Sequence, residues 1–227
     1  MKLKYKIIIP ARKNSKRLKG KNLKILNGKP LIQHSIDYAL LNFDKNDIWV
    51  NSDDNNIIKL SKSMKINSVD RPKKFSTDTT PTVDVLKFQL DYFRKKNIAC
   101  DAIILLQPTN PFRSKKLLTN SINIFERSKR SSLATFSKSS IKLGKIQNDF
   151  FEPINYKFGQ RSQDLNTFFF ENGQIYISKI ENINKGNIIS DDVYPMITSD
   201  RGSYIDIDTM SDFIEAENYL KNLKDEK

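Results

Sequence analysis

The chain predicts an α/β protein with a mostly parallel central sheet and helices on both faces. Short apolar runs alternate with amphipathic helical patterns over roughly the first 140 residues. The run at 102–106 (AIILL) is apolar throughout, as expected of a strand that is buried on both faces. The chain has 227 residues, which fits one large domain or one domain with an insert. We therefore treat residues 1–227 as a single domain.

The strands and helices of this domain follow from residue spacing. Strands are predicted at 4–10, 47–51, 102–106 and 132–136. Helices are predicted at 30–41, 55–64 and 117–125. One more helix is expected to start at Thr80-Pro81, where a capping hydroxyl precedes a proline at the first helical position.

The pattern changes from about residue 140 to 200. Short strands are predicted at 150–151, 168–170 and 174–177, between turns and with poor periodicity. We interpret this segment as an antiparallel insert that either covers the site or carries a subunit contact. The chain then returns to a strand at 204–206. A final helix is expected to start at Thr209, where Asp212 completes a variant of the capping box.

Cysteine content and hydropathy limit the class of protein. The single cysteine, Cys100, excludes an internal disulfide framework and a multi-cysteine metal site, which favours a reducing compartment. No run approaches eighteen apolar residues, and the N-terminus enters a strand without the pattern of a signal peptide. We expect a cytoplasmic protein with no membrane partner.

The net charge of +13 raises the possibility of a nucleic-acid-binding protein. However, 30 lysines and only 9 arginines are scattered over every segment, as in a general compositional bias. No RNP, zinc-finger or helix-turn-helix pattern is present. We therefore expect no nucleic-acid partner and keep this class as the alternative. The arginines are more informative, because their planar donors suit phosphate and carboxylate.

The most informative segment is 7–22 (IIIPARKNSKRLKGKN), where an apolar strand runs into a basic loop. So many cations in a small space require an anion to offset their repulsion. The small residues and Gly20 let backbone N–H groups approach a phosphate chain. Arg12 and Lys21 are expected to neutralise a triphosphate. Asn22 could read a base or ribose edge, although a plain turn residue is an equal alternative.

Two further motifs add polar groups at predicted strand ends. In the motif at 71–80 (RPKKFSTDTT), Arg71 and Ser76 are candidate nucleotide ligands, while Thr80 is expected only to cap the next helix. In the motif at 105–113 (LLQPTNPFR), two prolines stiffen the turn after a core strand. This turn fixes Gln107 at the edge where open α/β sheets bind ligands. Arg113 is expected only to cap a loop.

The last two motifs lie in the second half of the chain. In the motif at 172–177 (NGQIYI), Tyr176 could join Arg161 in binding an acidic sugar, with ordinary packing as an equal alternative. In the motif at 204–209 (YIDIDT), strand alternation places Asp206 and Asp208 on one side. Two such carboxylates suit Mg²⁺ together with a phosphate oxygen, and a helix N-cap is the alternative.

Taken in order, these motifs resemble the acylneuraminate cytidylyltransferase (CMP-sialic acid synthetase) family. The resemblance spans roughly residues 6–220 and includes the segments PAR-x-x-SK, RP-x-x-x-STDTTPT, LLQPT-x-PFR, NG-x-IYI and DIDT. It implies a Rossmann-like nucleotidyltransferase fold and a homodimer joined through the inserted segment. It also implies a reaction of CTP with the anomeric hydroxyl of an acylneuraminate, giving a CMP-sugar and pyrophosphate.

The resemblance also implies a role for each matching residue. Phosphates would be held by Arg12 and Lys21 with the help of Lys16, and cytidine would contact Asn22, Arg71 and Ser76. The sugar would contact Gln107, Arg161 and Tyr176. Magnesium would be held by Asp206 and Asp208, and Asp208 could take the hydroxyl proton through water.

Departures from the family pattern concern the sugar. Sialate-activating members often carry Gly in place of Arg17 and a Phe-Arg pair before the Asn-Gly turn, where this chain has Phe169-Phe170. The segment 161–165 (RSQDL) is similar to relatives that activate pseudaminate or legionaminate. A 3-deoxy-manno-octulosonate cytidylyltransferase is the alternative enzyme, but its usual R-F-x-S-T-R-L-P loop is absent.

Overall fold

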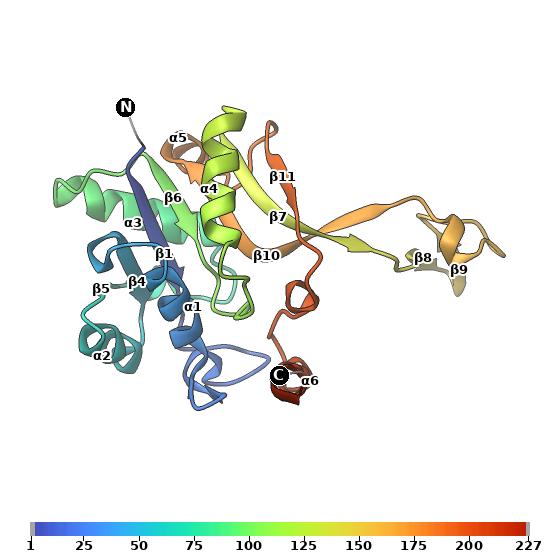
Figure 1. Cartoon of the computed structure of the whole chain (residues 1–227), viewed down its shortest axis with the longest axis horizontal. Coiled ribbons are helices and arrows are strands. Elements are labelled where there is room, and N and C mark those ends of the chain that lie inside the picture. The colour runs from blue at the N-terminus through green and yellow to red at the C-terminus, as the bar shows by residue number, and fades with distance from the viewer. Residues whose placement is uncertain (1–2, 226–227) are drawn as a thin grey trace.

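A seven-stranded sheet forms the centre of the computed structural model, which describes residues 3–225 (Figure 1). The strands lie in the order β11-β7-β10-β6-β1-β4-β5. Strand β10 runs antiparallel to β6 and β7, and the other neighbouring strands are parallel. Their bounds are β1 Tyr5–Pro10, β4 Ile48–Ser52, β5 Asn67–Asp70, β6 Ala102–Leu105, β7 Ser132–Ser139, β10 Phe168–Lys179 and β11 Tyr194–Ile197.

Helices cover both faces of this sheet, which confirms the predicted α/β class. The bounds are α1 Leu31–Leu40, α2 Asn55–Ser63, α3 Thr82–Lys95, α4 Leu117–Ser128, α5 Ile180–Lys185 and α6 Met210–Asp225. On one face, Ile7 and Ile9 of β1 share a buried cluster with residues of α1, α2 and α4. On the other face, Ile8 shares a cluster with Trp49 and with residues of α3 and α5. Alternate side chains of β1 thus contribute to two hydrophobic cores, one on each face of the sheet.

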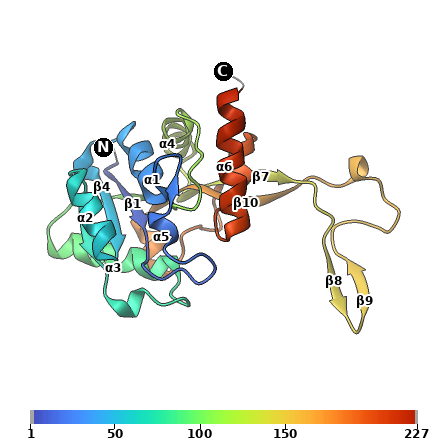
Figure 2. The same ribbon diagram turned by 90° about the horizontal axis from the view of Figure 1, so that it is seen from below.

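A third buried cluster joins the C-terminal helix to the basic loop. Leu18 of the loop and Leu26 of the small hairpin β2 (Ile25–Leu26) and β3 (Lys29–Pro30) pack with Phe213 of α6. Ile205 and Ile207 of the preceding segment belong to the same cluster. In Figure 2, α6 stands apart from the other helices, beside the strands that lead to the arm. This packing brings the end of the chain back to the first loop.

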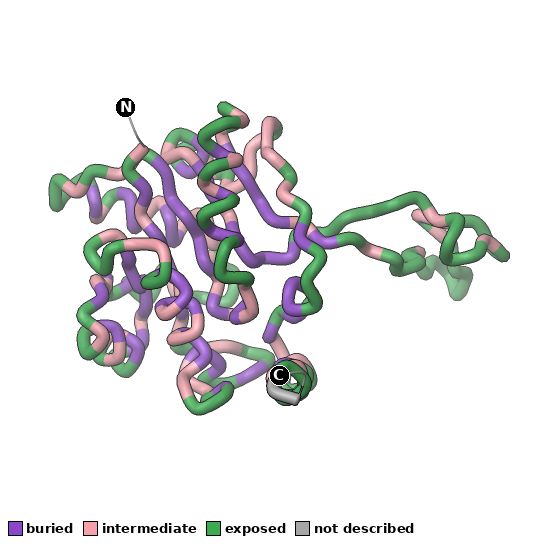
Figure 3. The backbone as a smooth tube through the Cα atoms, viewed as in Figure 1, coloured by how far each residue is buried: buried purple, intermediate pink, exposed green. Residues whose placement is uncertain are grey.

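A long arm projects from the body and carries the hairpin β8 (Gly144–Gln147) and β9 (Phe150–Pro153) (Figures 1 and 2). The predicted insert at about 140–200 is longer than this arm. Strand β10 includes both predicted strands at 168–170 and 174–177, and its second half and β11 lie in the central sheet. Figure 3 shows that most residues of the arm are exposed, whereas buried residues dominate the strands of the central sheet.

Local predictions differ from the structure at four places. The predicted strand at 204–206 is wrong, because Arg201–Tyr204 forms a 3-10 helix and 205–206 join no strand. The prediction that Thr80 caps α3 is also wrong. The helix begins at Thr82 after Pro81, without a side-chain cap, and the Thr80 hydroxyl bonds to that of Thr77 (2.6 Å between oxygens). Strands β5 and β11 were not expected at all.

The buried position of β6 predicts a large stability effect. Ile104 is fully buried between β1 and β10, so Ile104→Ala should lower the free energy of unfolding by about 2–5 kcal/mol. Urea unfolding monitored by circular dichroism measures the loss. Leu41→Ala is the control, because Leu41 is 64% exposed and should lose no more than about 0.5 kcal/mol. Equal losses in the two variants would contradict the assigned core.

Candidate active site

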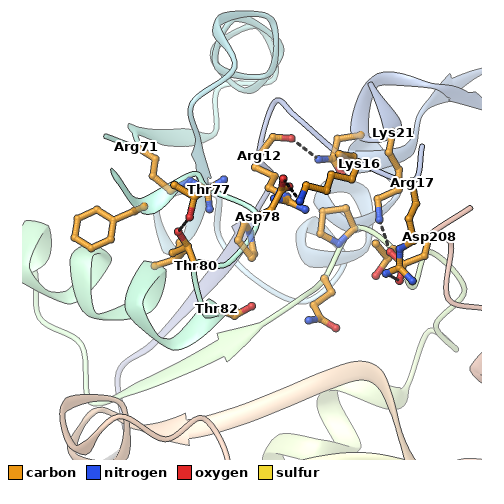
Figure 4. Close-up of a pocket in the computed structure, with 18 residues that line it drawn as sticks. Arg12, Lys16, Arg17, Lys21, Arg71, Thr77, Asp78, Thr80, Thr82 and Asp208 are labelled. Atoms are coloured by element: carbon orange, nitrogen blue, oxygen red, sulfur yellow. Dashed lines mark hydrogen bonds and ion pairs between the residues drawn. The ribbon is translucent and has the colours of Figure 1, made fainter. Parts of the chain in front are cut away.

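The carboxyl ends of β1, β4 and β6 meet at one edge of the sheet, and a cavity of about 290 Å³ opens there (Figure 4). The basic loop, the 71–80 segment, the turn after β6 and the segment before α6 all contribute to its wall. Seven predicted site residues line it: Arg12, Lys16, Lys21, Asn22, Arg71, Gln107 and Asp208. Open α/β sheets bind ligands at this edge, because the loops that follow parallel strands converge on it.

The basic loop is held in shape by hydrogen bonds to neighbouring strands. The amide of Ala11 donates to the Asn51 carbonyl (2.9 Å), and the amide of Lys13 donates to Asp53 (2.8 Å). The buried side chain of Asn22 donates to the Arg12 carbonyl (3.1 Å). The side-chain amide of Asn22 therefore already helps to shape the loop. The contact of Asn22 with a base or ribose stays a prediction.

Four cations of the loop are paired with two aspartates from distant segments (Figure 4). Arg12 and Lys16 both contact the Asp78 carboxylate, with Lys16 at 3.0 Å from its oxygen. On the other side, Arg17 and Lys21 both contact Asp208, with Lys21 at 2.7 Å. Each carboxylate thus lies between two cations. The hydrogen bonds from Lys16 and Arg12 lower the pKa of Asp78.

Arg71 supplies a fifth cation at the opposite end of the cavity (Figure 4). Its side chain is buried, with one guanidinium nitrogen 3.6 Å from Asp53. The nitrogens Nε and Nη2 of Arg71 have no hydrogen-bond partner among the described residues. Burial lowers the pKa of this guanidinium, and Asp53 opposes that effect. A buried donor without an acceptor costs about 1–3 kcal/mol, so an acceptor from a ligand would stabilise this end of the cavity.

The remaining four predicted residues do not line the cavity. Ser76 donates to the Pro72 carbonyl (3.3 Å), whereas Thr77 and Thr80 of the same segment line the wall. Arg161 lies exposed on the arm and pairs with Asp164 (2.8 Å). Tyr176 packs in the core on the α3 side and its hydroxyl donates to Glu171 (3.3 Å).

Asp206 is the fourth of these residues. As a whole it is exposed, but its carboxyl is desolvated enough to raise its pKa, and the nearby charge of Asp208 raises it further. A hydrogen bond from Thr109 and the charge of Lys21 oppose the shift. The two aspartates therefore interact electrostatically, but only Asp208 lines the cavity, and their predicted role as a magnesium pair stays a prediction.

Sequence reasoning missed three residues of the site. Arg17 was counted only among the cations of the basic loop and as a departure from the family pattern, and Asp78 was only the one carboxylate within the 71–80 motif. Asp53 was not considered, yet it contacts both the loop backbone and Arg71. Their position in the sequence could have indicated a site role. Asp53 directly follows β4, and Asp78 follows β5 within one polar segment, so both come after the carboxyl end of a strand.

Comparison with known proteins identifies the family. A family model described as cytidylyltransferase matches residues 6–223. The chain belongs to this family. It is therefore a nucleotidyltransferase, and the resemblance found from the motifs is confirmed. No helix within residues 3–225 is both long and apolar enough to cross a membrane.

Several curated relatives are about equally similar to this cytidylyltransferase. A CMP-N,N'-diacetyllegionaminic acid synthase of Legionella pneumophila is 30% identical over 223 residues, which covers 94% of this chain and 95% of the relative. A pseudaminic acid cytidylyltransferase of Campylobacter jejuni is 30% identical, with coverage of 90% and 91%. An N-acylneuraminate cytidylyltransferase of Streptococcus agalactiae is 30% identical, and the match spans about half (52%) of that longer protein.

Solved structures confirm the fold. A CMP:2-keto-3-deoxy-manno-octonic acid synthetase complexed with CTP superimposes with a TM-score of 0.70. The alignment covers 96% of this chain and 99% of the other, at 17% sequence identity. At that identity the likeness concerns the nucleotidyltransferase fold alone.

The pairing of Asp78 with two cations predicts that this carboxylate competes with an anionic ligand. Asp78→Asn should strengthen the binding of inorganic triphosphate by roughly threefold to tenfold at low salt, because the charges of Arg12 and Lys16 would no longer be neutralised by a carboxylate. Isothermal titration calorimetry measures the dissociation constant. Asp91→Asn removes the same charge from an exposed pair on α3 and is the control. Weaker binding in Asp78→Asn would show that the carboxylate helps to hold the ligand.

Proposed function

We propose that the protein transfers a cytidylyl group from CTP to the anomeric hydroxyl of an acidic nonulosonic sugar and releases pyrophosphate. The observation that carries the proposal is the cavity in which four loop cations and Asp208 face Gln107 across the sheet edge. The relatives named for legionaminic, pseudaminic and N-acylneuraminic acid support the class of sugar. The motif departures leave the individual sugar open within this class.

The loop cations suit the charge that develops in such a transfer. The anomeric oxygen attacks the α-phosphorus, a new P–O bond forms, and the bond to the pyrophosphate oxygen breaks. Negative charge grows on the phosphoryl and leaving oxygens, so fixed cations such as Arg12 and Lys21 stabilise the transition state. The hydroxyl proton leaves to a carboxylate such as Asp208 or to water. Arg71, with its unbonded nitrogens Nε and Nη2, would donate hydrogen bonds to acceptor atoms at the nucleoside end.

We propose that Asp208 at the cavity, with Asp206 two residues before it, holds a magnesium ion that arrives with the nucleotide. Mg²⁺ commonly takes one or two carboxylates plus phosphate oxygens. Desolvation raises the pKa of Asp206, and the nearby charge of Asp208 raises it further; a bound cation would stabilise both carboxylates in their charged form. Within residues 3–225, no group of three or more His, Cys, Asp or Glu could hold a metal alone. When bound, the ion would neutralise phosphate charge.

The proposal is tested by a panel of acidic sugars with CTP and Mg²⁺, with CMP-sugar and pyrophosphate measured as products. Wild type should release pyrophosphate only when CTP, Mg²⁺ and a nonulosonic acid are all present. Asp208→Asn should lower turnover by about a hundredfold or more at normal Mg²⁺, since it removes a carboxylate that faces the cavity. Asp91→Asn on α3 should keep wild-type turnover. Full activity of Asp208→Asn would remove the metal assignment.

We also propose that the protein is a homodimer joined through the arm and acts in the cytoplasm. The arm exposes many large apolar side chains, which is unfavourable in water unless a partner covers them. They include Ile146 (76% exposed), Phe150 (78%) and Phe158 (71%). Arg161 lies on the same arm, outside the cavity of its own chain. Its expected sugar contact therefore requires a second copy.

The dimer proposal predicts that a charged side chain introduced on the arm lowers the molecular mass of the protein in solution. Phe150→Glu should shift wild-type dimer to monomer at micromolar concentration, because a buried carboxylate is strongly unfavourable in an apolar interface. Light scattering coupled to size exclusion measures the mass. Leu41→Glu on the body, also at an exposed apolar position, should leave the mass unchanged. A monomeric wild type would end this part of the proposal.

A further inference from the structure

Arg113 joins three elements beneath the cavity. Its Nη2 donates to the Gln107 carbonyl in the turn after β6 (2.7 Å), and its Nε donates to the Gln174 carbonyl of β10 (2.6 Å). Its Nη1 donates to the Ser35 hydroxyl on α1 (3.1 Å). The guanidinium also lies 5.6 Å from the ring centre of Tyr38, on the same helix.

The cation has no carboxylate partner in these contacts. No ion pair of Arg113 occurs among the described residues, and its hydrogen-bond acceptors are two carbonyls and one hydroxyl. Desolvation lowers the pKa of Arg113 to about 10, so the group stays charged at neutral pH. A desolvated charge is costly unless it is well hydrogen-bonded, and bonds from a charged donor are about twice as strong as neutral ones. The arginine is therefore explained by its hydrogen bonds: a single guanidinium donates strongly to two carbonyls and one hydroxyl at the same time.

The group that Arg113 fixes belongs to the cavity wall. Gln107 lines the cavity, and its carbonyl also accepts from Ser35 Oγ (3.4 Å) and from the Asn110 amide (3.3 Å). On the other side, its side chain lies against Gly173, where an added Cβ would be only 2.8 Å from Gln107 Oε1. Gly173 has φ +73°, which also favours glycine. Arg113 holds the backbone of Gln107, and Gly173 leaves room for its amide.

We propose that Arg113 is a positioning residue that fixes Gln107 for contact with the acceptor sugar. The part that concerns the sugar rests on the proposed function, whereas the part that concerns the turn does not. A displacement of about 1 Å in a substrate-positioning group can lower the rate about a hundredfold, so loss of one fixed carbonyl contact has a measurable effect. The role differs from that of Arg12 and Lys21, because Arg113 does not line the cavity.

A double-mutant cycle with Gln107 tests the proposal. Arg113→Lys keeps the charge but cannot bond to both carbonyls and the hydroxyl in the planar arrangement of a guanidinium. It should raise the KM for the sugar about tenfold, with the dissociation constant for CTP changed less than twofold by calorimetry. In the Gln107→Ala background, Arg113→Lys should change the sugar KM less than twofold, since contacting residues are not additive. Arg94→Lys, on the exposed face of α3, is the matched control.

If Arg113→Lys raised the sugar KM by the same factor in the wild-type and the Gln107→Ala backgrounds, the proposal would be overturned. A parallel loss of CTP affinity would also overturn it, because it would indicate a general structural role. If Arg113→Lys fails to fold, Ser35→Ala removes the hydroxyl that contacts both Arg113 and the Gln107 carbonyl. It should raise the sugar KM about threefold in the same cycle, and no change would overturn the proposal.

Hydrogen exchange separates this proposal from the proposed function. The amides of the 107–113 turn should exchange at least about tenfold faster in Arg113→Lys, or in Ser35→Ala to a smaller extent, while the amides of β1 are unchanged. If wild type transfers CMP to no sugar of the panel, the proposed function fails and the exchange result still decides whether Arg113 holds the turn. Unchanged exchange in the turn would overturn the positioning role.

Discussion

The structure of the site depends on balancing the like charges of one short loop. Four cations, Arg12, Lys16, Arg17 and Lys21, lie in a ten-residue stretch (12–21) that follows β1, and their repulsion would open the loop if no carboxylate faced them. Asp78 and Asp208 supply those carboxylates from segments 66 and 191 residues away from their arginine partners. The repulsion among cations that are close in sequence is thus offset by carboxylates that only the tertiary fold brings near them.

The position of Asp208 follows from apolar packing more than from its ion pairs. Ile205, Ile207 and Phe213 are buried against Leu18 and Leu26, so the segment before α6 is anchored on both sides of the aspartate. An ion pair with an exposed partner, such as Arg17, contributes up to about 1 kcal/mol, while burial of each large apolar side chain contributes about 1.5–3 kcal/mol. The hydrophobic cluster therefore fixes the position of the backbone around Asp208, and the ion pairs only orient its carboxylate.

The sequence predicted the sheet well where the hydrophobic pattern was strong. Strands β1, β4 and β6 and their helices follow directly from it, as does the edge that carries Arg12 and Gln107. It failed where structure depends on distant partners. The segment 204–206 looks like a strand because Ile205 and Ile207 alternate with polar residues, but its apolar side chains meet α6 and the loop without a strand ladder. The pairing of Asp78 has no local pattern at all.

Strand β10 shows why the site and the arm share one element. Its pairing with β7 shifts register between Glu171 and Tyr176, which leaves backbone groups without ladder partners. Side chains take their place: the Asn172 side chain accepts from the Gln174 amide (3.2 Å), and Thr135 Oγ1 accepts from the Ile175 amide (3.0 Å).

The Asn172 carbonyl at this irregularity in turn accepts from Asn110 in the turn after β6 (2.9 Å). Because buried backbone groups must be bonded, this network fixes the irregularity of β10 between its arm-side half and the half that pairs with both β7 and β6. The same irregularity places Gly173 against Gln107, so the geometry of the cavity wall and the course of β10 toward the arm have one structural origin.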